Sequence, residues 1–169
     1  MTAPRVQPGG SFGTLGGVTR NSIGALNPVT GAVRAWYPAS EGAVSALATS
    51  ASTVVVGGSF RNIGLHSRTF LAAVDKVTGV ARAWDPHPGD SVSALKVADG
   101  QVFVGGAFPS LTGEARRGFS VYDESDLAAL DPQPDDPTLV WTQHTAAAPW
   151  SVRYGHSLLD YDGKLWLIG

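Results

Sequence analysis

The residues of this chain that could bind a phosphate are glycine pairs that follow short apolar runs. Gly57 and Gly58 end the run in VVVGGSF, and such a pair can cradle a phosphate between a strand and a helix. The flanking residues match neither G-x-G-x-x-G nor G-x-x-x-x-G-K-[ST], and the polar stretch RNIGLHSR that follows has no helical pattern. The sequence therefore predicts a strand that ends in a turn, not a phosphate loop.

Histidines and carboxylates are the next residues whose chemistry could define a site. His66 and His87 lie in two predicted loops, and Asp90 follows His87, so the three could converge on one rim. Zinc requires three or four ligands at about 2 Å, and the sequence offers no short-spaced pair of ligands. We therefore expect no metal site and interpret these histidines as solvated loop residues.

Catalytic and calcium-binding patterns are also missing from the sequence. There is no G-x-S-x-G elbow to activate a serine, and paired carboxylates cannot be assigned from sequence. The acidic stretch between Asp123 and Asp136 lacks the D-x-[DN]-x-[DN]-G spacing of a calcium loop and is interrupted by prolines. We expect a solvated linker there, and a protein that is not an enzyme and carries no cofactor.

Composition limits the class of partner. Charged residues make up 15% of the 169 residues and the formal net charge is −2, so there is no basic surface for a nucleic acid. The absence of cysteine removes disulfides, zinc thiolates and thiol nucleophiles. No apolar run approaches the roughly 20 residues of a membrane span, and the N-terminal MTAPRVQPGG contains no signal-peptide core.

The elements that position these residues are set by an internal repeat. GGSF occurs at Gly9 and at Gly57, and GGAF at Gly105, each 48 residues after the last. The stretches VTG, RAW and VSAL recur with the same step, and the first two copies align without a gap. The glycine pair therefore belongs to a repeated scaffold.

Each copy contains four short runs that favour strands, because they are rich in Val, Thr, Phe and Trp. In the second copy they are Val44–Ala48, Thr53–Gly58, Thr69–Asp75 and Val80–Trp84. Four strands every 40–50 residues without helices are typical of propeller blades. We predict an all-β fold of four-stranded antiparallel β-propeller blades, in which the VVV run is buried on both faces.

Turn chemistry separates these strands. Asn27 and Asp75 can accept hydrogen bonds from the turn backbone, and Gly31 and Gly79 can take positive φ. The Asp-Gly pair in ADGQ predicts a hairpin between the first and second strands of the next copy.

Two further residue types recur once in each copy and are expected to serve the scaffold. Trp36 and Trp84 are predicted to pack one blade against the next. Arg20, Arg68 and Arg116 are expected to hydrogen-bond backbone carbonyls or a strand-end acid, the alternative being an arginine ring that receives an anion.

The pattern VVVGGSF…R…FLAAVD-VTG-RAW-P…VSAL resembles the bacterial delta-sixty propeller repeat, and AAVDKVTGVARAW is similar to the quinoprotein (PQQ-type) blade motif. This resemblance covers about residues 9–131. The third copy departs from it, because it lacks the Thr-Gly pair and has Pro132 at the Trp position. An acidic, proline-rich linker is expected over residues 132–140.

Residues 141–169 resemble the start of a kelch repeat. That motif combines an upstream tryptophan with an Arg-Tyr-Gly-His stretch and an Asp-Gly turn, here WTQHTAAAPWSVRYGHSLLDYDGKLWLIG. The resemblance implies a half blade, so the whole chain is interpreted as one propeller segment. Both resemblances imply a binding or scaffolding role, often in a secreted or surface protein, and we expect an extracellular or cell-surface location.

Closure of a ring poses a counting problem, because the chain holds about three to three and a half blades and propellers use four to eight. Two interpretations stay open. The sequence could be a fragment that forms an open arc of blades, or two chains could associate into a six-blade ring.

The expected function is binding of a protein or glycan partner through loops on the blade rim, residues 61–67, 85–90 and 109–115. These loops differ between copies while the strands repeat, which is how a rigid scaffold carries specificity. The candidate contact residues are Arg61, Asn62, His66, His87, Asp90 and Glu114. The alternative is a propeller domain associated with a quinoprotein-like or galactose-oxidase-like enzyme.

Overall fold

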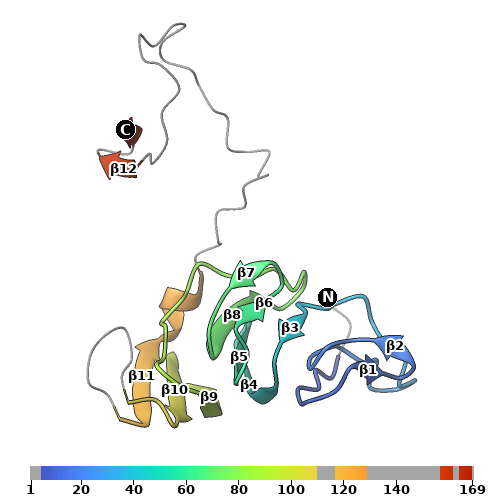
Figure 1. Ribbon diagram of the computed structural model, residues 1–169. Coiled ribbons are helices and arrows are strands. Elements are labelled where there is room, and N and C mark those ends of the chain that lie inside the picture. Colours follow the sequence, from blue (N-terminus) through green and yellow to red (C-terminus); the bar gives the residue numbers. More distant parts are fainter. Residues whose placement is uncertain (1–4, 110–116, 129–156, 162–163, 169) are drawn as a thin grey trace, which may run out of the picture. The chain divides into compact units, whose positions relative to one another are not determined.

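The computed structural model describes residues 5–109, 117–128, 157–161 and 164–168 of the chain. It divides into an N-terminal body, Met1–Gln133, and a C-terminal body, Pro134–Gly169. The fold is all-β, as predicted: the described residues form several small antiparallel sheets, none of them closed, and one short 3-10 helix (Figure 1). Among these residues no helix is long and apolar enough to cross a membrane.

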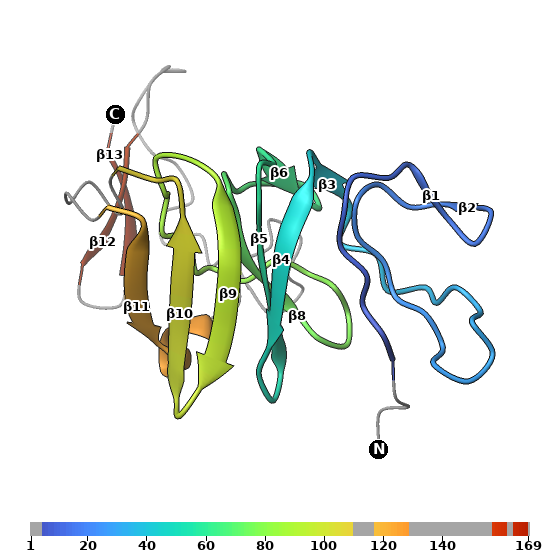
Figure 2. The same cartoon turned by 90° about the horizontal axis from the view of Figure 1, so that it is seen from below.

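Two sheets of the N-terminal body have the same topology, with the middle strand in sequence at the centre of each. The middle sheet has the order β4-β5-β8 and the third sheet the order β9-β10-β11. The two sheets lie side by side, β9 next to β4 (Figure 2). Their strands are β4 (Val44–Thr49), β5 (Thr53–Gly58), β8 (Leu71–Asp75), β9 (Val92–Ala98), β10 (Gln101–Gly106) and β11 (Phe119–Asp123).

The residues before the middle sheet repeat its geometry with isolated bridges in place of long strands. We call residues 5–37 the bridged segment. Val6 pairs with Leu26 as Val54 pairs with Val74, and Leu26 pairs with Val33 as Val74 pairs with Ala81. These pairings are 48 residues apart, so the sequence repeat is also a repeat of backbone pairing.

A small hairpin recurs after the glycine pairs of the first two copies. One hairpin joins β1 (Thr14–Leu15) to β2 (Val18–Thr19), and the other joins β6 (Asn62–Ile63) to β7 (His66–Ser67). The second hairpin is extended by β3 (Ser40–Glu41), which pairs with β6. No helix follows Gly58, as predicted, but the stretch expected to be a polar loop forms the β6–β7 hairpin.

The predicted fourth strand, Val80–Trp84, is the main departure from the expected four-stranded sheets. It pairs with β8 only through the bridge Val74 to Ala81 and through two ladder hydrogen bonds, from the Asp75 N–H to the Val80 carbonyl (2.7 Å) and from the Arg82 N–H to the Ala73 carbonyl (2.8 Å). The Arg82 carbonyl also accepts from the Arg68 guanidinium (3.2 Å). Each described sheet of this type is therefore three-stranded.

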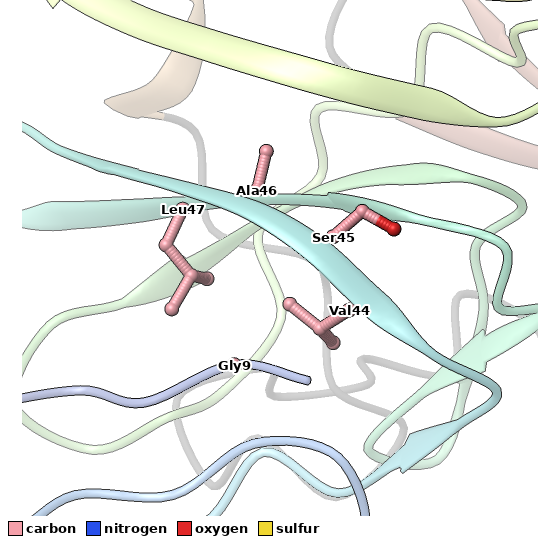
Figure 3. A pocket seen from close by; sticks show the side chains of 5 residues that line it. All are labelled: Gly9, Val44, Ser45, Ala46 and Leu47. Atoms are coloured by element: carbon pink, nitrogen blue, oxygen red, sulfur yellow. The ribbon is translucent and has the colours of Figure 1, made fainter. Parts of the chain in front are cut away.

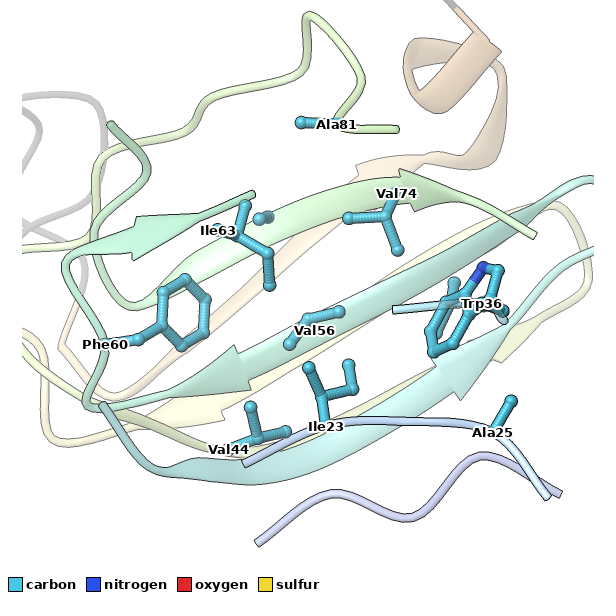
Figure 4. Close-up of a cluster of buried hydrophobic side chains, with 11 residues drawn as sticks. Ile23, Ala25, Trp36, Val44, Val56, Phe60, Ile63, Val74 and Ala81 are labelled. Atoms are coloured by element: carbon cyan, nitrogen blue, oxygen red, sulfur yellow. The ribbon is translucent and has the colours of Figure 1, made fainter. Parts of the chain in front are cut away.

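The core lies between successive copies, so that β5 is buried on both faces. Val54 and Val56 pack with Ile23 and Trp36 of the bridged segment (Figure 4), whereas Val55 packs against the third sheet. All six residues of β5 are buried. Burial on both faces explains why apolar and polar residues do not alternate in the valine run, because an inner strand between two sheets needs apolar residues on both sides.

The three glycine pairs have the same backbone setting. The second glycine of each pair donates its N–H to the residue twelve positions later: Gly10 to Ser22 (2.9 Å), Gly58 to Phe70 (2.9 Å) and Gly106 to Gly118 (3.0 Å). All three acceptors have positive φ, 60°, 66° and 71°. The repeat thus imposes a left-handed residue at this position, whichever side chain it carries.

The first glycine of a pair allows the next copy to approach closely. A Cβ at Gly57 would lie 2.6 Å from Cγ1 of Val92, and a Cβ at Gly9 would lie 2.6 Å from Cγ1 of Val44. Side chains are not tolerated at such distances, so glycine here is a packing requirement.

The third copy ends differently from the others. A 3-10 helix, η1 (Glu124–Ala128), follows β11 and buries Leu127. The Asp123 carboxylate accepts hydrogen bonds from the N–H (2.8 Å) and hydroxyl (2.6 Å) of Ser125. Leu127 thus holds this part of the acidic stretch against the core, while Asp123 and Asp126 stay exposed.

In the C-terminal body the structure describes an antiparallel hairpin of β12 (Ser157–Tyr161) and β13 (Lys164–Ile168). Residues 132–140 of the predicted linker lie outside the described residues.

Candidate binding rim

One end of the two large sheets carries most of the residues predicted to bind a partner. The register places Gly57 opposite Leu71, so the chain between β5 and β8 lies at the end where the glycine pairs stand. Ser91, which follows Asp90, accepts from the N–H of Ala107 just beyond β10, so the segment before β9 reaches the same end. We call this end the glycine rim.

The hairpin β6–β7 forms one part of the glycine rim. Arg61 precedes it and is exposed, and the Asn62 amide donates to the Glu41 carboxylate of β3 (2.6 Å). His66 is half-buried and pairs with Ile63, whose side chain lies in the core. The buried isoleucine fixes the hairpin to the sheet, while its polar neighbours stay accessible.

Leu65 is a rim residue that sequence reasoning did not single out. It stands at the hairpin turn and is fully exposed, with a relative accessibility of 102%. The turn is held by the Gly64 N–H, which donates to the Ala39 carbonyl (2.7 Å), and by the positive φ of Gly64. Comparing the copies was the available signal, since Gly17 occupies the equivalent place in the first hairpin.

A second part of the rim is an ion-pair cluster in the segment that leads to β9. The Asp85 carboxylate lies 3.2 Å from Nη1 of Arg68 and 3.0 Å from Nε2 of His87. Arg68 and Asp85 are largely buried, whereas the His87 side chain is 67% exposed and its backbone has a φ of +46°. The pair Arg68–Asp85 therefore ties the β7 end to this segment and presents His87 to solvent.

The repeated arginines bond the backbone, as predicted, where the structure describes them. Arg20 donates to the carbonyl of Arg34 (3.1 Å) and Arg68 to that of Arg82 (3.2 Å), 48 residues apart. Arg116 lies outside the described residues. The described arginines thus brace the scaffold.

The remaining candidates do not join these two clusters. The Asp90 carboxylate accepts from the adjacent Ser91 N–H (2.6 Å) and stays exposed. Glu114 lies outside the described residues. Among the described residues no group of three His, Asp or Glu side chains could hold a metal ion.

The opposite end of the sheets is occupied by the predicted turns. Asp75 accepts from the N–H groups of Val77 (2.8 Å) and Thr78 (2.7 Å), as Asn27 does from Val29 (2.9 Å) in the first copy. Gly31 and Gly79 have positive φ there, as predicted. The hairpin predicted at Asp99–Gly100 is also confirmed, since it joins β9 to β10.

Asp75 also holds the buried Arg82, whose Nη2 lies 2.6 Å from its carboxylate. Burial alone would raise the pKa of Asp75, but the hydrogen bonds from Thr78 and Val77 and the charge of Arg82 outweigh it and lower the pKa below its usual value. This carboxylate therefore stays ionised for a structural purpose.

The predicted tryptophan packing is confirmed. Trp36 is buried in the core, and its Nε1 donates to the Asp75 carbonyl of the next copy (3.0 Å). Trp84 packs edge-on against Tyr122 with ring centroids 5.1 Å apart. Both indoles bridge successive copies and neither is presented for ligand stacking.

A shallow hollow of about 210 Å³ lies beside β4, between Gly9 and the strand (Figure 3). Its lining consists of Gly9 and residues 44–47, none of which is titratable. The side chains of the lining are aliphatic apart from the Ser45 hydroxyl, so the hollow contains no charged group.

Comparison with known proteins found no match to this chain among family models, curated proteins or solved structures.

Proposed function

We propose that the N-terminal body is a segment of a β-propeller-type repeat scaffold that binds a partner through the glycine rim. The observation that carries this proposal is the 48-residue repetition of backbone pairing, together with a rim that differs between copies. A rigid repeated framework with variable connections at one end is the arrangement by which scaffolds carry specificity.

The chemistry of the rim favours a protein partner over a glycan. Leu65 is an unshielded aliphatic side chain, and Arg61 and the Glu41–Asn62 pair surround the same hairpin. An apolar anchor with a polar margin matches the composition of protein–protein contacts, where desolvation of the anchor supplies affinity and the margin supplies specificity.

Leu65→Asp tests this proposal. The immobilised chain is exposed to a surface-protein fraction of the source cells and, separately, to a glycan array. We expect a protein to be retained by the parent chain and retention to fall at least about tenfold with Leu65→Asp, because a carboxylate would replace the anchor.

Ala51→Asp is the matched control, since Ala51 is an exposed residue in the β4–β5 turn at the opposite end of the sheet. It should bind like the parent chain. Equal loss in both variants, or retention that ignores Leu65→Asp, would refute the rim as the binding surface, and retention on the glycan array would identify a sugar as the ligand instead.

A further inference from the structure

The third sheet has an apolar face that the described residues of the N-terminal body leave open. Phe103, Phe119 and Val121 lie on this outer face of β10 and β11, opposite the buried Val102 and Val104. Phe119 is 58% exposed and Val121 38% exposed, and the ring of Phe103 stacks on that of Phe119 at 6.4 Å. Exposure of adjacent large apolar groups on one sheet face marks an interaction surface.

The same face of the middle sheet shows what such a surface contacts inside the molecule. The residues 48 positions earlier, Val55, Leu71 and Ala73, are completely buried by the third sheet. There Val92 and Leu95 pack over Gly57, whereas the three atoms nearest to a Cβ at Gly105 belong to Ala94 and Gly118 of the same copy, the nearest being Cβ of Ala94 at 3.4 Å. Within the described part of the N-terminal body, the third sheet therefore exposes a surface of a kind that is covered one copy earlier.

The bridged segment exposes the complementary surface at the other end of the array. Val6 is 51% exposed, but its counterpart Val54 is completely buried against the preceding copy. Val6 pairs with Leu26 just as Val54 pairs with Val74. The exposed surface of the bridged segment therefore has the same backbone pairing as the buried surface of the middle sheet. The array thus presents one half of its internal contact at each end.

We propose that a second copy of this chain covers the outer face of β10 and β11, with the bridged segment of one copy against the third sheet of the other. Such a contact is head-to-tail, and it repeats an interface that already forms twice within the chain. Lys96, the register partner of Phe103, stands on the same face, where its alkyl stem can lie along apolar surface with the ammonium in water. The proposal is independent of partner binding at the glycine rim.

Self-association of the full chain tests it. Sedimentation equilibrium over a wide concentration range should show concentration-dependent self-association, either a dimer closed by two such contacts or larger head-to-tail oligomers. Val121→Glu should weaken this association at least about tenfold, because it buries a charge in the contact. Val80→Glu is the matched control, since Val80 is also 38% exposed but lies outside this face, and it should associate like the parent chain. A parent chain that is monomeric throughout, or equal effects of the two variants, would overturn the proposal.

The orientation is tested by cysteines, of which the parent chain has none. Chains carrying Phe119→Cys and chains carrying Val6→Cys should cross-link as mixed dimers, at least about tenfold more than either variant with itself. Self-paired Phe119→Cys dimers would show a face-to-face contact and would overturn the head-to-tail arrangement. This measurement also decides the matter if Val121→Glu fails to fold.

Discussion

At the scale of single residues, one backbone function is met by different side chains in successive copies. Asn27 and Asp75 hold equivalent turns through the same oxygen, but Asp75 also carries the ion pair to Arg82, which is only 8% exposed. The turn therefore requires only a side-chain oxygen that accepts hydrogen bonds, whereas the negative charge of Asp75 pairs with the buried guanidinium of Arg82.

Replacing Asp75 by Asn separates these two roles. The turn should survive, because Asn27 already supports it, but at pH 7 the variant should lose about 1–3 kcal/mol of unfolding free energy, since Arg82 loses a charged partner. The lowered pKa of Asp75 means that its contribution is present above the ordinary pKa near 4 and is lost as pH falls through the folded value. Urea unfolding at several pH values should thus show the gap between parent and Asp75→Asn closing below about pH 4. A gap that stays constant down to the lowest pH would contradict this role.

The left-handed position of the repeat gives a second prediction at this scale. Gly118→Ala should cost about 1–2 kcal/mol of stability, because a φ of 71° forces Cβ into a steric conflict that Ser22 and Phe70 already bear. Gly13→Ala is the control: Gly13 lacks positive φ and its Cβ would meet nothing within 4 Å, so the change should be neutral or slightly stabilising. Thermal unfolding of both variants measures the difference, and similar shifts would be the contrary result.

At the scale of elements, the packing of sheet on sheet depends on a missing side chain. β5 can lie against β9 because Gly57 admits Val92, and the same relation joins Gly9 to Val44. At these two positions the next sheet comes so close that only a residue without a side chain fits.

Gly57→Ala should therefore destabilise the N-terminal body by about 1–3 kcal/mol, because the new methyl would overlap Val92 in a packed core. Gly105→Ala is the matched control. Its Cβ would have ordinary contact with Ala94 at 3.4 Å, and the expected change is within about 0.5 kcal/mol. Denaturant unfolding compares the two, and an equal loss would show that the glycines serve strand geometry and not the approach of the next sheet.

At the scale of the whole molecule, the N-terminal body has two candidate contact surfaces with separate consequences. The glycine rim offers Leu65 and polar neighbours to a partner, and the outer face of the third sheet offers Phe119 and Val121 to a second copy. Leu65→Asp should leave self-association unchanged, and Val121→Glu should leave partner binding by the monomer unchanged. Partner retention therefore tests only the glycine rim, and sedimentation tests only the outer face of the third sheet.

The local elements could be predicted from the residues alone. β5 spans Thr53–Gly58 as predicted, because a valine run bounded by turn residues has one way to hydrogen-bond and bury itself. The Asp75 turn was also predictable, since an Asx oxygen and a glycine four residues later act within the same short segment. The all-β fold class follows from these local patterns and their repetition.

Which surfaces are covered could be learned only from the packing of the sheets. The predicted fourth strand pairs with β8 only at Ala81, and the rim cluster depends on contacts of Arg68 with the carbonyl of Arg82 and with Asp85, which lie 14 and 17 residues further along the chain. Repeated sequence could not show that Phe119 is exposed where Leu71 is buried, because burial is set by the neighbouring sheet and not by the residue or its strand.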